Sequence, residues 1–122
     1  MENGAKQYDL EDRTHEFARR VREFVKKLPR TIANLEDGKQ LIRSSGSVGA
    51  NYIEANEALS KKDFLMRIKI SRKEAKESRH WLLLLDTAGD IELEKERQAL
   101  VQEAKELTMI LSTILKNSSD RE

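Results

Sequence analysis

Apolar residues recur every three to four positions in four segments of the chain, and short polar breaks separate these segments. Such spacing places apolar side chains on one face of an α-helix. In the first segment the repeat consists of Phe17, Val21, Phe24 and Leu28. The pattern predicts helices over about 10–28, 31–59, 61–88 and 91–116, with ends near 1–8 and 117–122 that are expected to fray.

The breaks carry residues that stop and start helices. Pro29 ends the first helix, because the residue before a proline avoids the helical region. Ser60 followed by Asp63 is a capping-box variant, and Gly89–Asp90 supplies a turn after the third helix. Connections this short make neighbouring helices antiparallel. The sequence therefore predicts one all-α domain over residues 1–122, an up-down-up-down antiparallel four-helix bundle.

The third and fourth helices carry more apolar residues than one bundle core needs, which is about three positions per heptad. The residues outside the simple seam are Leu65, Ile70, Trp81, Leu83, Leu84, Val101, Ile110 and Leu115. This surplus predicts a second buried face and hence self-association. The alternative is a wide core stripe in a monomer.

A run of small residues interrupts the second helix. Gly46 and Gly49 should each cost about 1 kcal/mol relative to alanine in mid-helix, so close approach of another helix is expected. The third helix carries Ser71, Ala75 and Ser78 on its seam and is the expected neighbour.

Polar residues form a stripe beside these glycines, at helical spacings of four, four and three. Together with a glutamate of the third helix they are interpreted as a structural polar network: Arg43, Ser47, Asn51, Glu54 and Glu77. Buried networks of this kind hold helices in register. A ligand-binding groove is the alternative.

Composition narrows the class of protein. Of 122 residues, 38% are hydrophobic and 37% are charged, and there is no cysteine, which excludes disulfides and thiolate metal sites. The longest apolar run is Trp81–Leu85, so neither a signal peptide nor a membrane span is expected, and a cytoplasmic location is predicted.

The net charge of +1 hides two basic segments. Residues 13–30 contain seven basic and two acidic residues, and residues 61–80 contain eight and three. The main basic face lies on the third helix and comprises Lys69, Arg72, Lys73, Lys76 and Arg79. A second face on the first helix comprises Arg19, Arg22 and Lys26. Both are candidates for sequence-tolerant, salt-sensitive contacts with a nucleic-acid backbone, whereas a solvated helix face is the alternative.

Catalytic and metal chemistry are not predicted. Glu77-x-x-His80 and Asp12-x-x-His15 imitate the ligand motifs of di-iron bundles. However, His15 lies near the start of its helix and His80 far along a parallel one, about 20 Å apart along the bundle. Arg72 and His80 are too widely spaced for a helical-bundle ribonuclease pair. The sequence therefore predicts no enzyme, no metal and no cofactor.

Several of these segments together resemble the four-helix-bundle family of 23S rRNA intervening-sequence proteins, from about Tyr8 to Leu115. The resemblance rests on Arg43-Ser44, Ser47-Val-Gly-Ala-Asn51, Glu54, Ser60-Lys-Lys-Asp-Phe-Leu65 and Glu77. Ala55 departs from the glycine usual in the family, and Ser71 and Glu74 also differ from the common residues.

The resemblance implies a small bacterial protein that assembles as a ring-like homopentamer. A related branch is similar to the accessory variability protein of diversity-generating retroelements, which implies a reverse transcriptase and nucleic acid as partners. The chain is thus expected to be a non-enzymatic scaffold that binds structured RNA through repeated basic faces. A protein–protein scaffold that binds no nucleic acid is the alternative.

Overall fold

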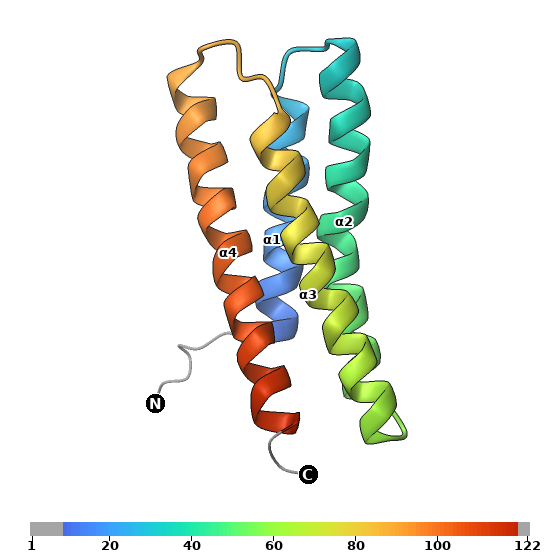
Figure 1. The fold of residues 1–122 in the computed structure, drawn as a ribbon. Helices are drawn as coiled ribbons and strands as arrows, with labels where there is room; N and C mark the ends of the chain where they lie inside the picture. Colours follow the sequence, from blue (N-terminus) through green and yellow to red (C-terminus); the bar gives the residue numbers. More distant parts are fainter. Residues whose placement is uncertain (1–8, 120–122) are drawn as a thin grey trace.

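The computed structural model describes residues 9–119, which form the helices α1 (Leu10–Lys26), α2 (Ile32–Asn56), α3 (Lys61–Leu84) and α4 (Ile91–Ser119). Successive helices run in opposite directions (Figure 1). Contacts join α1 to α2, α2 to α3, α3 to α4 and α4 to α1, so α1 and α3 occupy diagonal corners. The predicted all-α antiparallel four-helix bundle is confirmed.

Side-chain oxygens cap the start of each helix. Asp9, Thr31, Ser60 and Asp90 each accept a hydrogen bond from the backbone N–H three residues further on, at 2.9–3.1 Å. Such caps satisfy N–H groups that have no partner within the helix. The cap at Ser60 is the one that the sequence predicted.

The third helix ends earlier than predicted, at Leu84 instead of residue 88. The guanidinium of Arg97 on α4 donates to the carbonyl oxygens of Leu82, at 3.2 Å, and of Leu85. These bonds replace the hydrogen bonds that the two carbonyls would otherwise accept from N–H groups of a further helical turn, so α3 can end here. The chain then turns through Ala88 and Gly89, whose φ angles are 54° and 77°.

The other helix ends differ by a few residues. Helix α1 ends at Lys26, where the N–H of Lys27 bonds to Phe24 and tightens the turn before Pro29. Helix α2 ends at Asn56. Helix α4 continues to Ser119, three residues beyond the predicted end at 116. The predicted frayed segments 1–8 and 120–122 lie outside the described residues.

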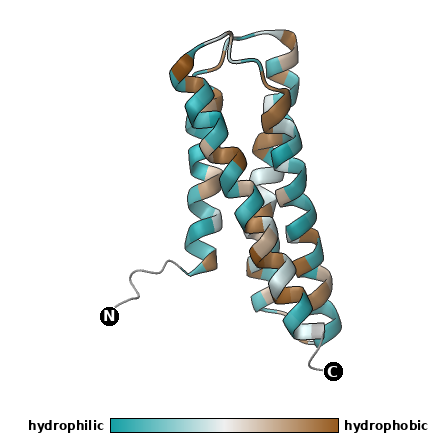
Figure 2. Ribbon diagram, turned by 60° about the vertical axis from the view of Figure 1, so that its left-hand side comes forward, coloured by the Kyte–Doolittle hydropathy of each residue, from teal (hydrophilic) through white to brown (hydrophobic). Residues whose placement is uncertain are grey.

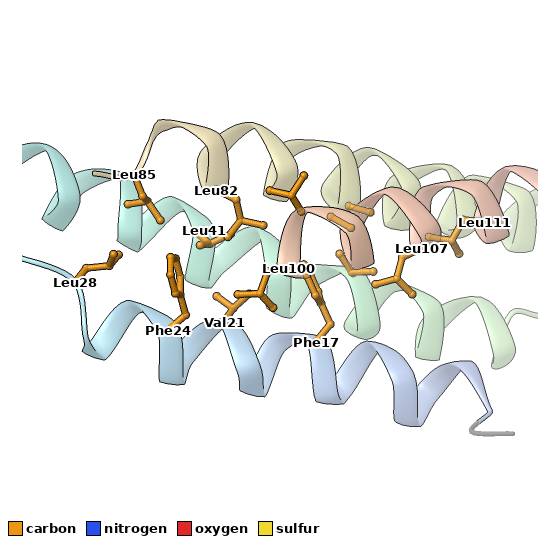
Figure 3. Close-up of a cluster of buried hydrophobic side chains, with 14 of the residues drawn as sticks. Phe17, Val21, Phe24, Leu28, Leu41, Leu82, Leu85, Leu100, Leu107 and Leu111 are labelled. Carbon is orange, nitrogen blue, oxygen red and sulfur yellow. The ribbon is translucent and has the colours of Figure 1, made fainter. Parts of the chain in front are cut away.

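The core is a column of apolar side chains that all four helices contribute (Figure 3). The four residues predicted for α1 are all buried. Val101 and Leu115, which the sequence placed in a surplus apolar face, belong to this core. Leu83 and Leu84 do remain exposed, at 46% and 54%. The surplus is therefore smaller than predicted.

Serines bring α2 and α3 close together, as expected. The Ser71 hydroxyl donates to the Val48 carbonyl at 2.7 Å, and the Ser44 and Ser78 hydroxyls are 2.9 Å apart. Gly49 instead faces α1, because a Cβ at this position would lie 2.8 Å from the Thr14 hydroxyl. Gly46 also faces α1, since a Cβ there would lie 3.5 Å from the Arg22 guanidinium, so the expectation that these glycines serve the contact with α3 is wrong.

One buried side chain joins the two loops at the same end of the bundle. Asn34 donates from Nδ2 to the carbonyls of Pro29 (3.0 Å) and Asp86 (2.9 Å), and its Oδ1 accepts from the Asp86 N–H (2.9 Å). The backbone of the α3–α4 loop is therefore held by α2.

Hydrophilic and hydrophobic residues alternate along each helix, as the colouring of the ribbon by hydropathy shows (Figure 2). Within residues 9–119, none of the helices is both long and apolar enough to span a bilayer.

Candidate nucleic-acid interface

The main basic face of α3 points away from α1 and borders α4. The Arg72 guanidinium donates to the Ser112 hydroxyl of α4 at 3.5 Å. Two turns further along, a cavity of about 350 Å³ opens between the helices. Its lining consists of Lys76, Arg79, Lys105, Thr108 and Met109. Helix α4 thus supplies a lysine to the face that the sequence assigned to α3 alone.

The nearby carboxylates of α3 face the other way. Arg43 of α2 forms ion pairs with Glu74 at 3.3 Å and with Glu77 at 3.2 Å. Glu74 is buried by this contact, since only 7% of the residue is exposed. Arg43 offsets one of these two negative charges, and it holds both carboxylates on the α2 side of α3, away from the cations that border α4.

The carboxylates of α4 are also directed away from this face. Arg13 of α1 bonds to Glu103 at 2.7 Å and to Glu106 at 2.7 Å. The hydrogen bonds that Arg13 donates to Glu103 are the main cause that raises the pKa of Arg13. As a result, within residues 9–119 the basic side chains of the α3–α4 face form no ion pair: Lys69, Arg72, Lys73, Lys76, Arg79 and Lys105.

Lys105 could be found from sequence only once its neighbour was known. On α4, Lys105, Met109, Ser112 and Lys116 follow one another at spacings of four, three and four, which places them along one stripe. The contact between Arg72 and Ser112 shows that this stripe borders the basic face of α3. The sequence of α4 by itself does not indicate which of its faces lies beside α3.

The second basic face is different in character. Arg19 bonds to Glu16 at 2.7 Å and Lys26 to Glu23 at 3.2 Å, within the same helix. The hydrogen bond from Arg19 lowers the pKa of Glu16. Only Arg22 in this set lacks a carboxylate partner among the described residues, and its Nη1 donates to the Ala18 carbonyl at 3.1 Å. Because α1 and α3 are diagonal, the two basic faces do not merge.

The predicted polar network divides into two groups along the α2–α3 seam. Arg43 and Glu77 belong to the first, with the ion pairs described above. In the second, Asn51 donates to the Ser47 carbonyl at 3.0 Å and accepts from Arg67 at 3.3 Å. The side chain of Glu54 is exposed and forms no hydrogen bond within residues 9–119. Sequence reasoning missed Glu74 and Arg67, which complete these contacts from α3.

The two histidines lie in separate surroundings. His15 borders a groove between α1 and α2, whereas His80 is exposed on α3, with its ring centroid 4.8 Å from that of Trp81. Among residues 9–119, no three potential metal-ligating side chains gather at one point.

Comparison with known proteins shows the family of this chain. The model of the 23S rRNA-intervening sequence protein family matches residues 6–113. The chain belongs to this family. This family member is similar to a solved structure from Bacteroides thetaiotaomicron VPI-5482, a protein of unknown function from the S23 ribosomal protein family. The two share 32% identity and a TM-score of 0.74, over 87% of this chain and 97% of the other. A search of curated proteins gave no match.

Proposed function

We propose that this family member is a non-enzymatic scaffold that binds structured RNA through the α3–α4 face. The observation that carries the proposal is the absence of ion pairs on that face within residues 9–119, while the carboxylates of both helices are bonded elsewhere. Unpaired cations in a row attract phosphates, and binding releases the counterions of the RNA.

The geometry of the α3–α4 face favours contacts with the phosphate backbone of the RNA. Lys69, Lys76 and Arg79 lie along about 15 Å of α3, given a rise of 1.5 Å per residue. Thr108 adds a hydroxyl beside these cations, and the cavity lining contains no aromatic ring on which a base would stack. Recognition is therefore expected to depend on phosphate spacing and to tolerate changes in sequence.

Self-association completes the proposal. The family resemblance implies a homopentamer, and the exposed Leu83 and Leu84 offer apolar surface for a contact between subunits. A ring repeats the basic face once per subunit, and several weak contacts to one RNA then add up. A reverse transcriptase with bound RNA, in the bacterial cytoplasm, is one partner for such a scaffold.

The test compares two charge-reversal triples. The first is Lys69→Glu, Lys73→Glu and Lys76→Glu on α3; the control is Arg19→Glu, Arg22→Glu and Lys26→Glu on α1, with the same change in net charge. Binding of a fluorescein-labelled RNA hairpin is measured by anisotropy over a range of salt concentrations. The α3 triple should weaken binding roughly 100-fold at low salt and make the salt slope shallower by about two to three.

The control triple should lose less than about tenfold, because it changes only the long-range field. Equal losses for the two triples would mean that net charge alone governs binding. Unchanged affinity in the α3 triple would exclude the α3–α4 face. Light scattering on the same samples gives the mass of the assembly and of its RNA complex.

A further inference from the structure

A long groove runs between α1 and α2, on the side of the bundle opposite the α3–α4 face. It consists of two cavities of about 440 and 370 Å³ that share Arg22 in their linings. From Glu11 to Lys26 the groove follows α1 for about 22 Å at 1.5 Å per residue. This length corresponds to about four turns of a helix, which is more than a small molecule requires.

The floor of the groove is apolar and partly open to solvent. Ile53 and Leu35 of α2 are 47% and 42% exposed, and Val25 and Ile42 are half-buried between them. Ala18 and Ala50 add short side chains that leave the groove deep. Apolar surface in a continuous concave strip is typical of a site where a partner docks.

Gly46 deepens the groove although the packing of the subunit does not require it. A Cβ at this position would lie 3.5 Å from the Arg22 guanidinium, which is ordinary van der Waals contact, and would meet nothing closer. A glycine in mid-helix still costs about 1 kcal/mol. Gly49 differs, since its Cβ would collide with Thr14.

The rim of the smaller cavity is positively charged, whereas Glu11 lies at the far end of the larger one. Four cations and no carboxylate line the smaller cavity: Arg22, Lys26, Arg30 and Lys39. Lys26 and Lys39 each bond to a glutamate of their own helix. Arg22 and Arg30 form no ion pair within the described part of the chain. The rim therefore complements a partner that carries carboxylates on both sides of an apolar strip.

We propose that the α1–α2 groove binds an amphipathic α-helix of another protein, with its apolar face on Val25, Ile42 and Ile53 and its Asp or Glu side chains toward Arg22 and Arg30. Docking of an amphipathic helix in an apolar groove is a recurring mode of recognition, read at spacings of three and four residues. Since this groove and the α3–α4 face lie on opposite sides, one subunit can hold a protein helix and RNA together.

A phage-displayed library tests the proposal. Its members are helical peptides of about fifteen residues with leucine along one face and either Glu or Lys at the flanking positions. The full-length protein should enrich Glu-rich members. A synthetic peptide from that pool should bind the Arg22→Glu, Arg30→Glu variant roughly tenfold more weakly, because two attractive pairs become repulsive. The matched control, Lys73→Glu with Lys76→Glu on α3, should bind it within about twofold.

A second variant separates the groove from its charges. Gly46→Leu favours the helix and fills the groove, so circular dichroism should show an intact fold while the peptide loses affinity. No enrichment, enrichment of Lys-rich members, or an equal loss in the α3 control would overturn the proposal. The proposal is also overturned if Gly46→Leu changes the mass of the assembly in the absence of peptide, because the groove would then be a contact between copies of this chain.

Discussion

Replacing Asn34 by alanine should destabilise the protein more than any exposed substitution, because Asn34 holds the two loops at one end of the bundle. The side chain is 4% exposed and forms three hydrogen bonds to the backbone of Pro29 and Asp86. Each bond contributes about 1 kcal/mol, and the buried loop groups lose their partner at the same time. The expected loss is about 3 kcal/mol, or roughly 10 °C in Tm.

The assay is urea unfolding followed by circular dichroism and by the fluorescence of Trp81, the single tryptophan. Protein concentration is kept fixed, because self-association makes apparent stability depend on it. Asn56→Ala is the matched control on the same helix. Asn56 is exposed, and its side chain donates a single hydrogen bond within residues 9–119, to Glu11 at 3.2 Å, so the substitution should cost no more than about 0.5 kcal/mol. A loss below about 1 kcal/mol in Asn34→Ala would refute the reasoning.

Three further substitutions test individual contacts. Gly49→Ala should destabilise the protein by about 1–2 kcal/mol, since the new Cβ would lie 2.8 Å from the buried Thr14 hydroxyl of α1. Gly46→Ala should instead stabilise it by up to about 1 kcal/mol, because alanine favours the helix. Thermal unfolding of the two variants compares these effects. Trp81→Phe should leave the free energy of unfolding unchanged or higher, because the buried indole N–H has no partner in residues 9–119; a clear loss in urea unfolding would contradict this. Hydrogen bonds, chiefly from Arg97 and also from Gln98 and Thr87, lower the pKa of Glu94 from 4.5 to about 2. A depressed pKa stabilises the fold above pH 4.5, and this stability is lost as the pH falls toward about 2. Glu94→Gln should make the free energy of unfolding depend less on pH between about 2 and 4.5. An unchanged pH dependence in this range would exclude the Glu94–Arg97 pair as a source of the acid sensitivity.

Much of the fold was accessible from sequence because it follows from local periodicity. The apolar repeat from Phe17 to Leu28 and the cap at Ser60 are properties of single segments, and both were predicted correctly. The end of α3 was not, since Arg97 and Asn34 act on it from other helices. No signal near Leu84 indicates those contacts.

The candidate site divides in the same way. The sequence by itself determined that α3 carries a stripe of cations, because the stripe depends only on the helical repeat. The sequence also placed Arg43 and Glu77 in one polar network, but only the tertiary structure decided that Glu74 bonds to Arg43 as well, and that Lys105 joins the stripe from α4. The physical reason is that the rotation of each helix about its axis is set by packing against two neighbours at once, and this rotation determines which charges share a surface.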